Sequence, residues 1–163
     1  MTHNPNKTEE NSLDLTTDQI NFDEILNGTK DKEYRQINSI TVSKLIDNKL
    51  VDGELQLVCN HDLISQERFD RYANDIMYYN DGVFPYIPKD IKYLNLGVGY
   101  HEDRNTMTVE VTDISFEPGR DKVGDIARFS YEKEGEPIAD KEGDFTIWQI
   151  VFHLGRVVKA NGK

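Results

Sequence analysis

The chain has almost no cysteine: Cys59 is the only one among 163 residues. A lone cysteine forms no intrachain disulfide, so nothing in the sequence indicates an oxidising compartment. Cys59 and His61 have a spacing that suits two metal ligands, but a zinc site needs three or four ligands and the sequence offers no second pair. We therefore predict neither a metal site nor a cofactor.

Long apolar runs are also missing. No stretch approaches the roughly 20 apolar residues of a membrane-spanning helix. Residues 1–12 lack the basic-then-apolar order of a secretory signal. We expect a cytoplasmic protein with no membrane partner. Because residues 1–12 contain little that could bury apolar surface, we predict that they form a disordered tail.

Positive charge is scarce as well. The sequence has 19 Lys and Arg residues against 30 Asp and Glu residues, a formal net charge of −11. A general nucleic-acid binder gains most of its affinity by neutralising phosphates, so this balance works against a long phosphate-tracking groove. A local basic pocket inside an acidic shell remains compatible with it. The same charge also suits an acidic interaction protein with a basic protein partner.

Several catalytic patterns are absent. The sequence contains no zinc-binding His-Glu-x-x-His helix, no Ser-His-Asp order and no phosphate-cradling glycine loop. Its length suits one domain, which we place at residues 13–163. Residues 60–90 are interpreted as an insertion, a candidate lid or partner surface. No pattern in the sequence assigns an oligomeric state.

Periodicity and turn residues predict the secondary structure. A strand begins at Leu13, and the capping spacing of Thr16 and Gln19 predicts a helix over about residues 17–27. Asn38-Ser39 could cap a short helix that buries Ile40, Leu45 and Ile46, and apolar residues recur at helical spacing over residues 63–80. Further strands are predicted over residues 31–36, 50–60, 92–100, 105–114, 122–129 and 145–154. Residues 132–144 are charged and glycine-rich, which predicts a loop.

The end of the first helix carries the main functional candidates. Asn27-Gly28 is a helix stop, and a charged run with Lys30, Glu33 and Arg35 follows it. In a straight strand Glu33 and Arg35 share one face, so Lys30 can join them only from the turn before the strand becomes regular.

Three blocks resemble the ASCH domain family, small relatives of the PUA fold, in its phage and bacterial form. They are Phe22-x-x-Ile25-x-x-Gly28-Thr29-Lys30-x-x-Glu33-Tyr34-Arg35, residues 93–100 together with residues 104–111, and the closing stretch at residues 148–157. The resemblance implies an α+β fold: a PUA-like, partly open β-barrel with flanking helices. It also implies a role for Lys30, because an ASCH-type amidohydrolase that acts on acylated cytidine uses the lysine at the matching position. That enzyme has a threonine where this chain has Glu33.

Each candidate residue has two interpretations. Lys30 beside Glu33 could act as a base or nucleophile, or be a solvated turn lysine. Glu33 and Arg35 could present an acceptor and a donor fork to a nucleobase, or form a structural ion pair. Tyr100 and Arg104 flank a predicted hairpin turn, where a ring and a guanidinium would suit nucleotide recognition, although such loop residues are common without function.

We therefore expect a binding module for RNA, or for a modified nucleobase or nucleotide, with a polar cleft lined by candidate residues. These ligand-binding candidates are Lys30, Glu33, Arg35, Tyr100 and Arg104, and the catalytic candidates are Lys30 and Glu33. The first alternative is a small enzyme that uses Lys30, either an amidohydrolase on acylated nucleosides or a ribonuclease. The second is an acidic protein-interaction protein, of phage or cellular origin, that binds a basic partner.

Overall fold

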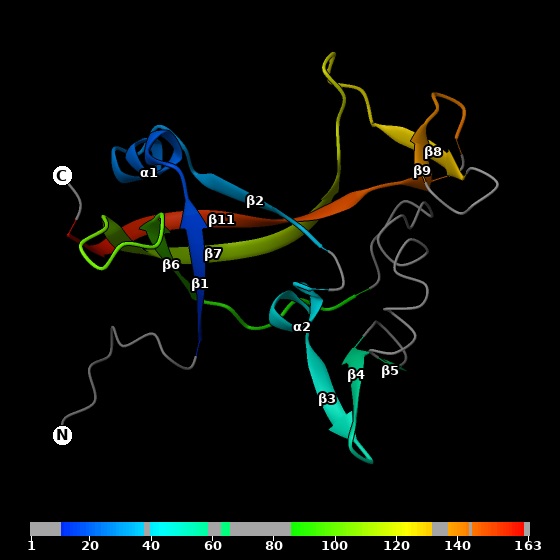
Figure 1. Ribbon diagram of the computed structural model, residues 1–163, viewed down its shortest axis with the longest axis horizontal. Helices are drawn as coiled ribbons and strands as arrows, with labels where there is room; N and C mark the ends of the chain where they lie inside the picture. Colours follow the sequence, from blue (N-terminus) through cyan, green and yellow to red (C-terminus); the bar gives the residue numbers. More distant parts are fainter. Residues whose placement is uncertain are drawn as a thin grey trace. The chain divides into compact units, whose positions relative to one another are not determined.

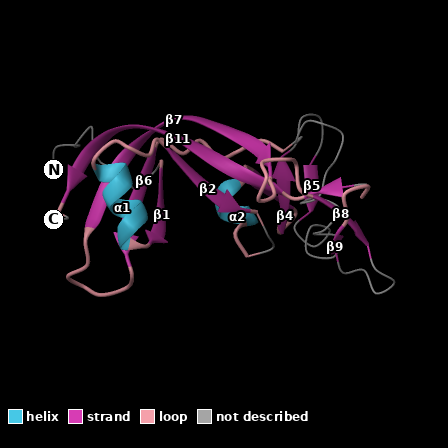
Figure 2. Cartoon of the chain, turned by 90° about the horizontal axis from the view of Figure 1, so that it is seen from above, coloured by secondary structure: helices cyan, strands magenta, loops and turns pink. Residues whose placement is uncertain are grey.

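The computed structural model shows a mixed α+β protein built mainly from strands (Figures 1 and 2). It describes residues 11–37, 40–58, 63–65, 86–131, 137–143 and 145–161. In these ranges the helices are α1 (Gln19–Leu26) and α2 (Val42–Leu45). Neither helix is long and apolar enough to span a bilayer.

The largest sheet has five strands in the order β1-β6-β7-β11-β2. Their bounds are β1 (Ser12–Thr17), β6 (Tyr93–Val98), β7 (Thr106–Pro118), β11 (Trp148–Ala160) and β2 (Lys32–Gln36). β1 runs parallel to β6, and β6 runs antiparallel to β7. The predicted hairpin of residues 92–114 is therefore confirmed.

Two smaller sheets have three strands each. One joins β3 (Asn48–Val51), β4 (Glu54–Val58) and β5 (Leu63–Ser65) in that order. The other has the order β10-β8-β9, with β8 (Arg128–Tyr131), β9 (Pro137–Ala139) and β10 (Phe145–Thr146). The α+β class is confirmed. The sheets of the described residues do not close into a barrel, so the finer prediction of a PUA-like barrel stays a prediction.

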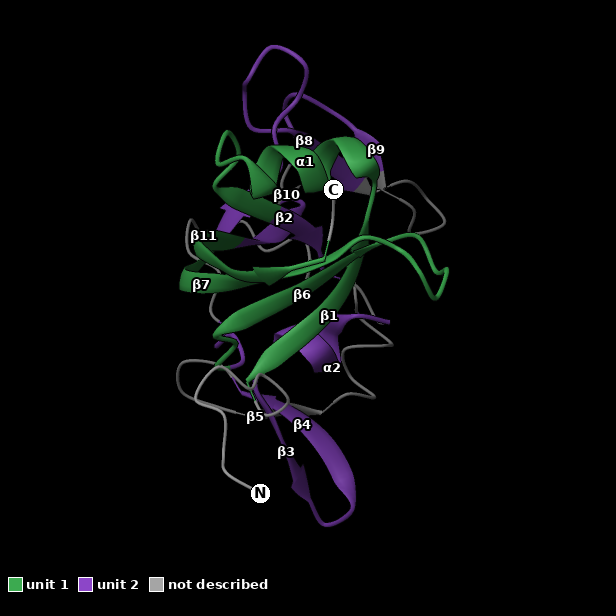
Figure 3. Cartoon of the chain, turned by 90° about the vertical axis from the view of Figure 1, so that its left-hand side faces the viewer, with its two compact units in different colours: residues 1–33, 90–115, 152–163 green, residues 34–89, 116–151 purple. Residues whose placement is uncertain are grey.

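The chain divides into two compact units (Figure 3). Unit 1 comprises residues 1–33, 90–115 and 152–163, and unit 2 comprises residues 34–89 and 116–151. Three strands, β2, β7 and β11, contribute residues to both units. The candidate residues Lys30, Glu33, Tyr100 and Arg104 belong to unit 1, and Arg35 belongs to unit 2.

In unit 1, helix α1 packs on β6. In the register of the sheet, Leu94 lies between Leu13 and Val109, and all three are buried. Phe22 and Ile25 are the buried residues of α1. The other buried apolar residues of unit 1 are Ile91, Leu96, Met107 and Phe152. Burial of such side chains stabilises a fold by about 1.5–3 kcal/mol each, which is why this short helix stays in place.

Unit 2 has a core of its own. Its buried apolar residues are Ile37, Val42, Leu45, Ile46, Leu57, Tyr86, Trp148, Ile150 and Val151. The burial of Leu45 and Ile46 agrees with the sequence analysis. Ile40 was expected inside as well, but it is 82% exposed. The reason is that α2 begins only at Val42, with Thr41 as its cap, so Ile40 precedes the helix.

Several predicted boundaries were wrong. Helix α1 is capped by Asp18, whose side chain accepts from the Asn21 N–H, whereas Thr16 belongs to β1. Of the strand predicted over residues 50–60, the described residues 50–58 belong to a hairpin, because Asp52 and Gly53 take positive φ angles of 52° and 79° and turn the chain back. Positive φ angles at both central residues are typical of the two-residue turns that connect the strands of a β-hairpin.

Three further predictions need correction or lie partly outside the described residues. Residues 63–65 form β5, so the helix predicted over residues 63–80 does not begin there, and most of that range is not described. The strand predicted over residues 122–129 begins only at Arg128, because hydrogen bonds of Asp121 close a turn before it. β1 starts at Ser12, the last residue of the predicted tail, and residues 1–10 lie outside the description.

Candidate functional site

The turn after α1 places Lys30 before the next strand begins. Gly28 has φ +84°, a conformation that closes a helix end at no steric cost to glycine. The N–H groups of Thr29 and Lys30 both donate to the Glu24 carbonyl, at 2.9 and 3.1 Å. Because β2 starts at Lys32, Lys30 lies in the turn, where side chains need not alternate between the two faces as they do in a strand. This is the arrangement that the sequence analysis required for Lys30 to meet Glu33.

Lys30 and Glu33 do come together. The Lys30 Nζ lies 3.7 Å from the Glu33 Oε1, and the two side chains are 32% and 5% exposed. Glu33 is thus an almost fully buried carboxylate, whereas the lysine still reaches solvent. Burying an ionised carboxylate costs several kcal/mol unless partners compensate its charge. The nearby ammonium is one of these partners.

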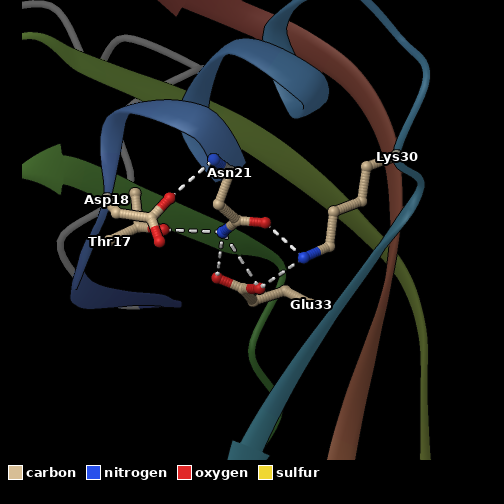
Figure 4. A network of polar contacts seen from close by, with 5 residues as sticks. All are labelled: Thr17, Asp18, Asn21, Lys30 and Glu33. Carbon is tan, nitrogen blue, oxygen red and sulfur yellow. Dashed lines mark hydrogen bonds and ion pairs between the residues drawn. The ribbon is translucent and has the colours of Figure 1, made fainter.

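The centre of the network is Asn21, a residue that the sequence analysis did not select (Figure 4). Its Nδ2 donates to both Glu33 carboxylate oxygens, at 3.3 and 3.1 Å, and to the Thr17 Oγ1 at 2.6 Å. Its Oδ1 accepts from the Lys30 Nζ. Its backbone N–H donates to the Asp18 Oδ1 at 2.7 Å. We call Thr17, Asn21, Lys30 and Glu33 the amide network.

Local structure explains how these groups meet. Asn21 lies in the first turn of α1, where a side chain points back toward the helix start and therefore toward Thr17, four residues earlier. Glu33 is the second residue of β2. The Asp31 carbonyl accepts from the Leu154 N–H of β11 at 2.8 Å, which ties the start of β2 to the sheet. Helix, turn and strand thus each supply part of the amide network.

The remaining candidate residues are Arg35, Tyr100 and Arg104. Arg35 is two residues further along β2, in unit 2. Arg104 lies in the turn between β6 and β7, where its guanidinium donates to the Gly99 carbonyl at 2.7 Å. The same side chain covers Gly97, where a Cβ would meet the Arg104 Nε at 2.6 Å. Arg104 therefore has a structural role in this hairpin. Tyr100 is 86% exposed.

Two observations bear on the remaining expectations. The His153 Nε2 lies 2.8 Å from the Ser115 Oγ, a contact between neighbouring strands β11 and β7. Within the described ranges, no group of three or more His, Cys, Asp or Glu side chains could hold a metal ion. Cys59 and His61 lie outside those ranges.

Sequence reasoning missed Thr17 and Asn21 because their role depends on a contact across 12 residues, between α1 and β2. A usable signal did exist. The side chain of an Asn in the first turn of a helix points back toward the helix start, where it can meet a Thr that precedes the helix. Nothing in the sequence, however, indicates that Glu33 lies beside Asn21.

Comparison of the chain with protein-family models, with curated proteins and with solved structures finds no match.

Proposed function

We propose that the amide network is the contact point for a nucleobase-sized ligand, either a modified nucleobase, a nucleoside or nucleotide, or an unpaired base of an RNA. The observation that carries this proposal is that the Lys30 ammonium has hydrogen-bonding capacity left over and reaches solvent. Its ammonium has three N–H groups, and the acceptors of the network, Asn21 and Glu33, engage at most two of them. With 32% of the side chain exposed, a further N–H is available to a ligand oxygen or ring nitrogen.

The roles of the two charged residues differ in this proposal. Lys30 is the residue that touches the ligand. Glu33 is too deeply buried to serve as an open acceptor, so it acts through Lys30 by holding the ammonium in place. The exposed residue Tyr100 is the candidate for base stacking, which is worth about 1–3 kcal/mol per base. Arg104 is less suited to a ligand, since its guanidinium is engaged by the hairpin backbone.

Charge favours a small ligand over a long RNA. Residues 18–33 carry five carboxylates and two lysines. Of these carboxylates, Asp18, Asp23, Glu24 and Asp31 are exposed. A chain of phosphates would be repelled by this surface, because phosphate binding depends on Lys and Arg. The ASCH resemblance provides a separate motive, since it points to the same lysine.

The test is a thermal-shift and calorimetric screen against nucleosides, acylated and methylated nucleosides, nucleotides and short single-stranded RNA. A ligand at 100 times its dissociation constant should stabilise the protein by about 2.7 kcal/mol. We expect Lys30→Gln to weaken the hit by about tenfold, the loss of one charge-assisted hydrogen bond. The matched control is Lys92→Gln, which changes an exposed lysine of the same unit and should leave the affinity unchanged.

The absence of any hit would contradict the proposal, as would a hit of equal affinity in the wild type and in Lys30→Gln.

The short distance between the Lys30 Nζ and the Glu33 carboxylate favours a second candidate function, that of an enzyme. Lys30 reaches solvent beside a buried carboxylate, and its amine, once deprotonated, could act as a base or a nucleophile. The substrates would be acylated nucleosides, cleaved at the amide, or RNA. Incubation of each binding hit with the protein, followed by chromatography, separates the two functions. Product that forms with the wild type and not with Lys30→Gln identifies an enzyme, and an unchanged ligand identifies a binding module.

A further inference from the structure

Asn21 is the one side chain of the amide network that contacts all the others. Its orientation follows from its partners, since its oxygen faces an ammonium and its nitrogen faces a carboxylate (Figure 4). The flipped amide would point N–H groups at Lys30 and an oxygen at Glu33. Both contacts would be repulsive, so the chemistry allows one orientation only.

The amide of Asn21 contacts both Lys30 and Glu33, which are not in direct contact with each other. A lysine and a carboxylate in direct contact approach to about 2.7–2.9 Å. Here the Lys30 Nζ stays 3.7 Å from the Glu33 Oε1, while the neutral Asn21 oxygen accepts from the ammonium. The Thr17 hydroxyl and the capped first turn of α1 hold Asn21 itself.

We infer that Asn21 is the positioning residue of this site: its amide keeps the Lys30 ammonium 3.7 Å from Glu33, short of direct contact, and leaves the lysine available for other chemistry. The inference rests on the proposed function only in taking Lys30 as the ligand contact. A neutral acceptor holds the ammonium less strongly than a carboxylate does. Without the amide, Lys30 closes onto Glu33 and becomes both less reactive and less able to reach a ligand.

The reactivity of Lys30 tests this without any ligand. The folded protein is treated with a limiting amount of acetic anhydride, which acylates the neutral amine and releases acetate and a proton. Peptide mass spectrometry then gives the rate at Lys30 relative to Lys92, an exposed lysine of the same unit. We expect Asn21→Ala to lower this ratio by about threefold, a typical strength for a partly exposed ion pair.

The matched control is Gln19→Ala, which removes an amide from the same helix. Gln19 contacts Asp23 and Asn105 and not the amide network, so the ratio should not change. A ratio in Asn21→Ala equal to or above the wild-type value would overturn the inference, because a merely structural asparagine would give that result.

A second variant guards against loss of folding. Asn21→Asp combined with Glu33→Gln keeps one amide and one carboxylate but exchanges their places. We expect the double variant to melt within a few degrees of the wild type while Lys30 now contacts a carboxylate directly and reacts about threefold more slowly. A double variant with a wild-type acylation ratio would count against the positioning role.

The two proposals fail separately. If no nucleoside binds but the acylation ratio falls as expected, the proposed function is wrong and the role of Asn21 stands. If a nucleoside binds through Lys30 and the ratio does not change, the role of Asn21 is wrong and the proposed function stands.

Discussion

At the scale of single residues, the main energetic feature of the site is the buried carboxylate of Glu33. Its side chain is 5% exposed, and the ammonium that neutralises it is only partly buried. The energy of this pair lies between two limits: exposed ion pairs are worth about 0–1 kcal/mol, and breaking a fully buried pair costs about 3–5 kcal/mol. Lys30→Met therefore leaves Glu33 with less compensation than the native network provides.

A double-mutant cycle measures the pair. With Lys30→Met, Glu33→Gln and the double variant, urea unfolding should give a coupling free energy of about 1–2 kcal/mol. The comparison is the exposed pair of Lys92 and Asp90, whose side chains are 58% and 78% exposed. A cycle with Lys92→Met and Asp90→Asn should give at most about 0.5 kcal/mol. Equal coupling free energies in the two cycles would mean that the burial of Glu33 does not strengthen its interaction with Lys30.

At the scale of elements, the turn between β3 and β4 depends on two left-handed residues. Asp52 and Gly53 have φ angles of 52° and 79°. Side-chain-bearing residues pay about 1–2 kcal/mol in this region, whereas glycine, asparagine and aspartate tolerate it better. We expect Gly53→Ala to lower the free energy of unfolding by about 1 kcal/mol, since no atom lies within 4 Å of the added Cβ and only the backbone conformation resists it.

The control for this prediction is Asp52→Asn, which puts the preferred Asn-Gly pair into the turn and should be neutral or slightly stabilising. Chemical denaturation of the three proteins gives both values. Loss of stability in Asp52→Asn together with none in Gly53→Ala would show that the turn is not held in this conformation.

The elements that sequence reasoning predicted correctly are those with a local cause. The stop at Gly28 needs only glycine in a left-handed conformation, and the β6–β7 hairpin follows from alternating residues. The Asp52-Gly53 turn could also have been predicted, because Asp-Gly is a strong hairpin signal. A single strand was predicted instead, because apolar and polar residues alternate near this turn. Asp18 and Thr16 compete for the same helix start, and only the backbone decides between them.

The candidate site divides in the same way. Lys30 and Glu33 meet because they are three residues apart across a turn, which the sequence displays. Asn21 meets Glu33 because α1 folds back beside β2, and the packing of Phe22 and Ile25 fixes that position. Packing of this kind is decided by the whole sheet, so no local pattern could have named Asn21.

At the scale of the whole molecule, net charge is the main variable. A formal charge of −11 on 163 residues makes the compact state repel itself more than the expanded chain does. We expect the thermal midpoint to rise by several degrees as sodium chloride increases from about 0.01 to 0.3 M, because the screening length falls well below molecular dimensions. Potassium chloride should match it at equal ionic strength. A midpoint that falls with salt would indicate that attractive pairs such as Lys30 and Glu33 outweigh the general repulsion.

The position of Trp148 has a practical consequence. It is the only tryptophan of the chain, it is 5% exposed, and it belongs to unit 2. Its fluorescence is therefore a built-in optical probe of one half of the molecule, whereas circular dichroism reports the backbone of both halves. Superimposable melting curves from the two methods would mean that the halves unfold as one cooperative body. Curves that separate would give the stability of each half without a label or a truncation.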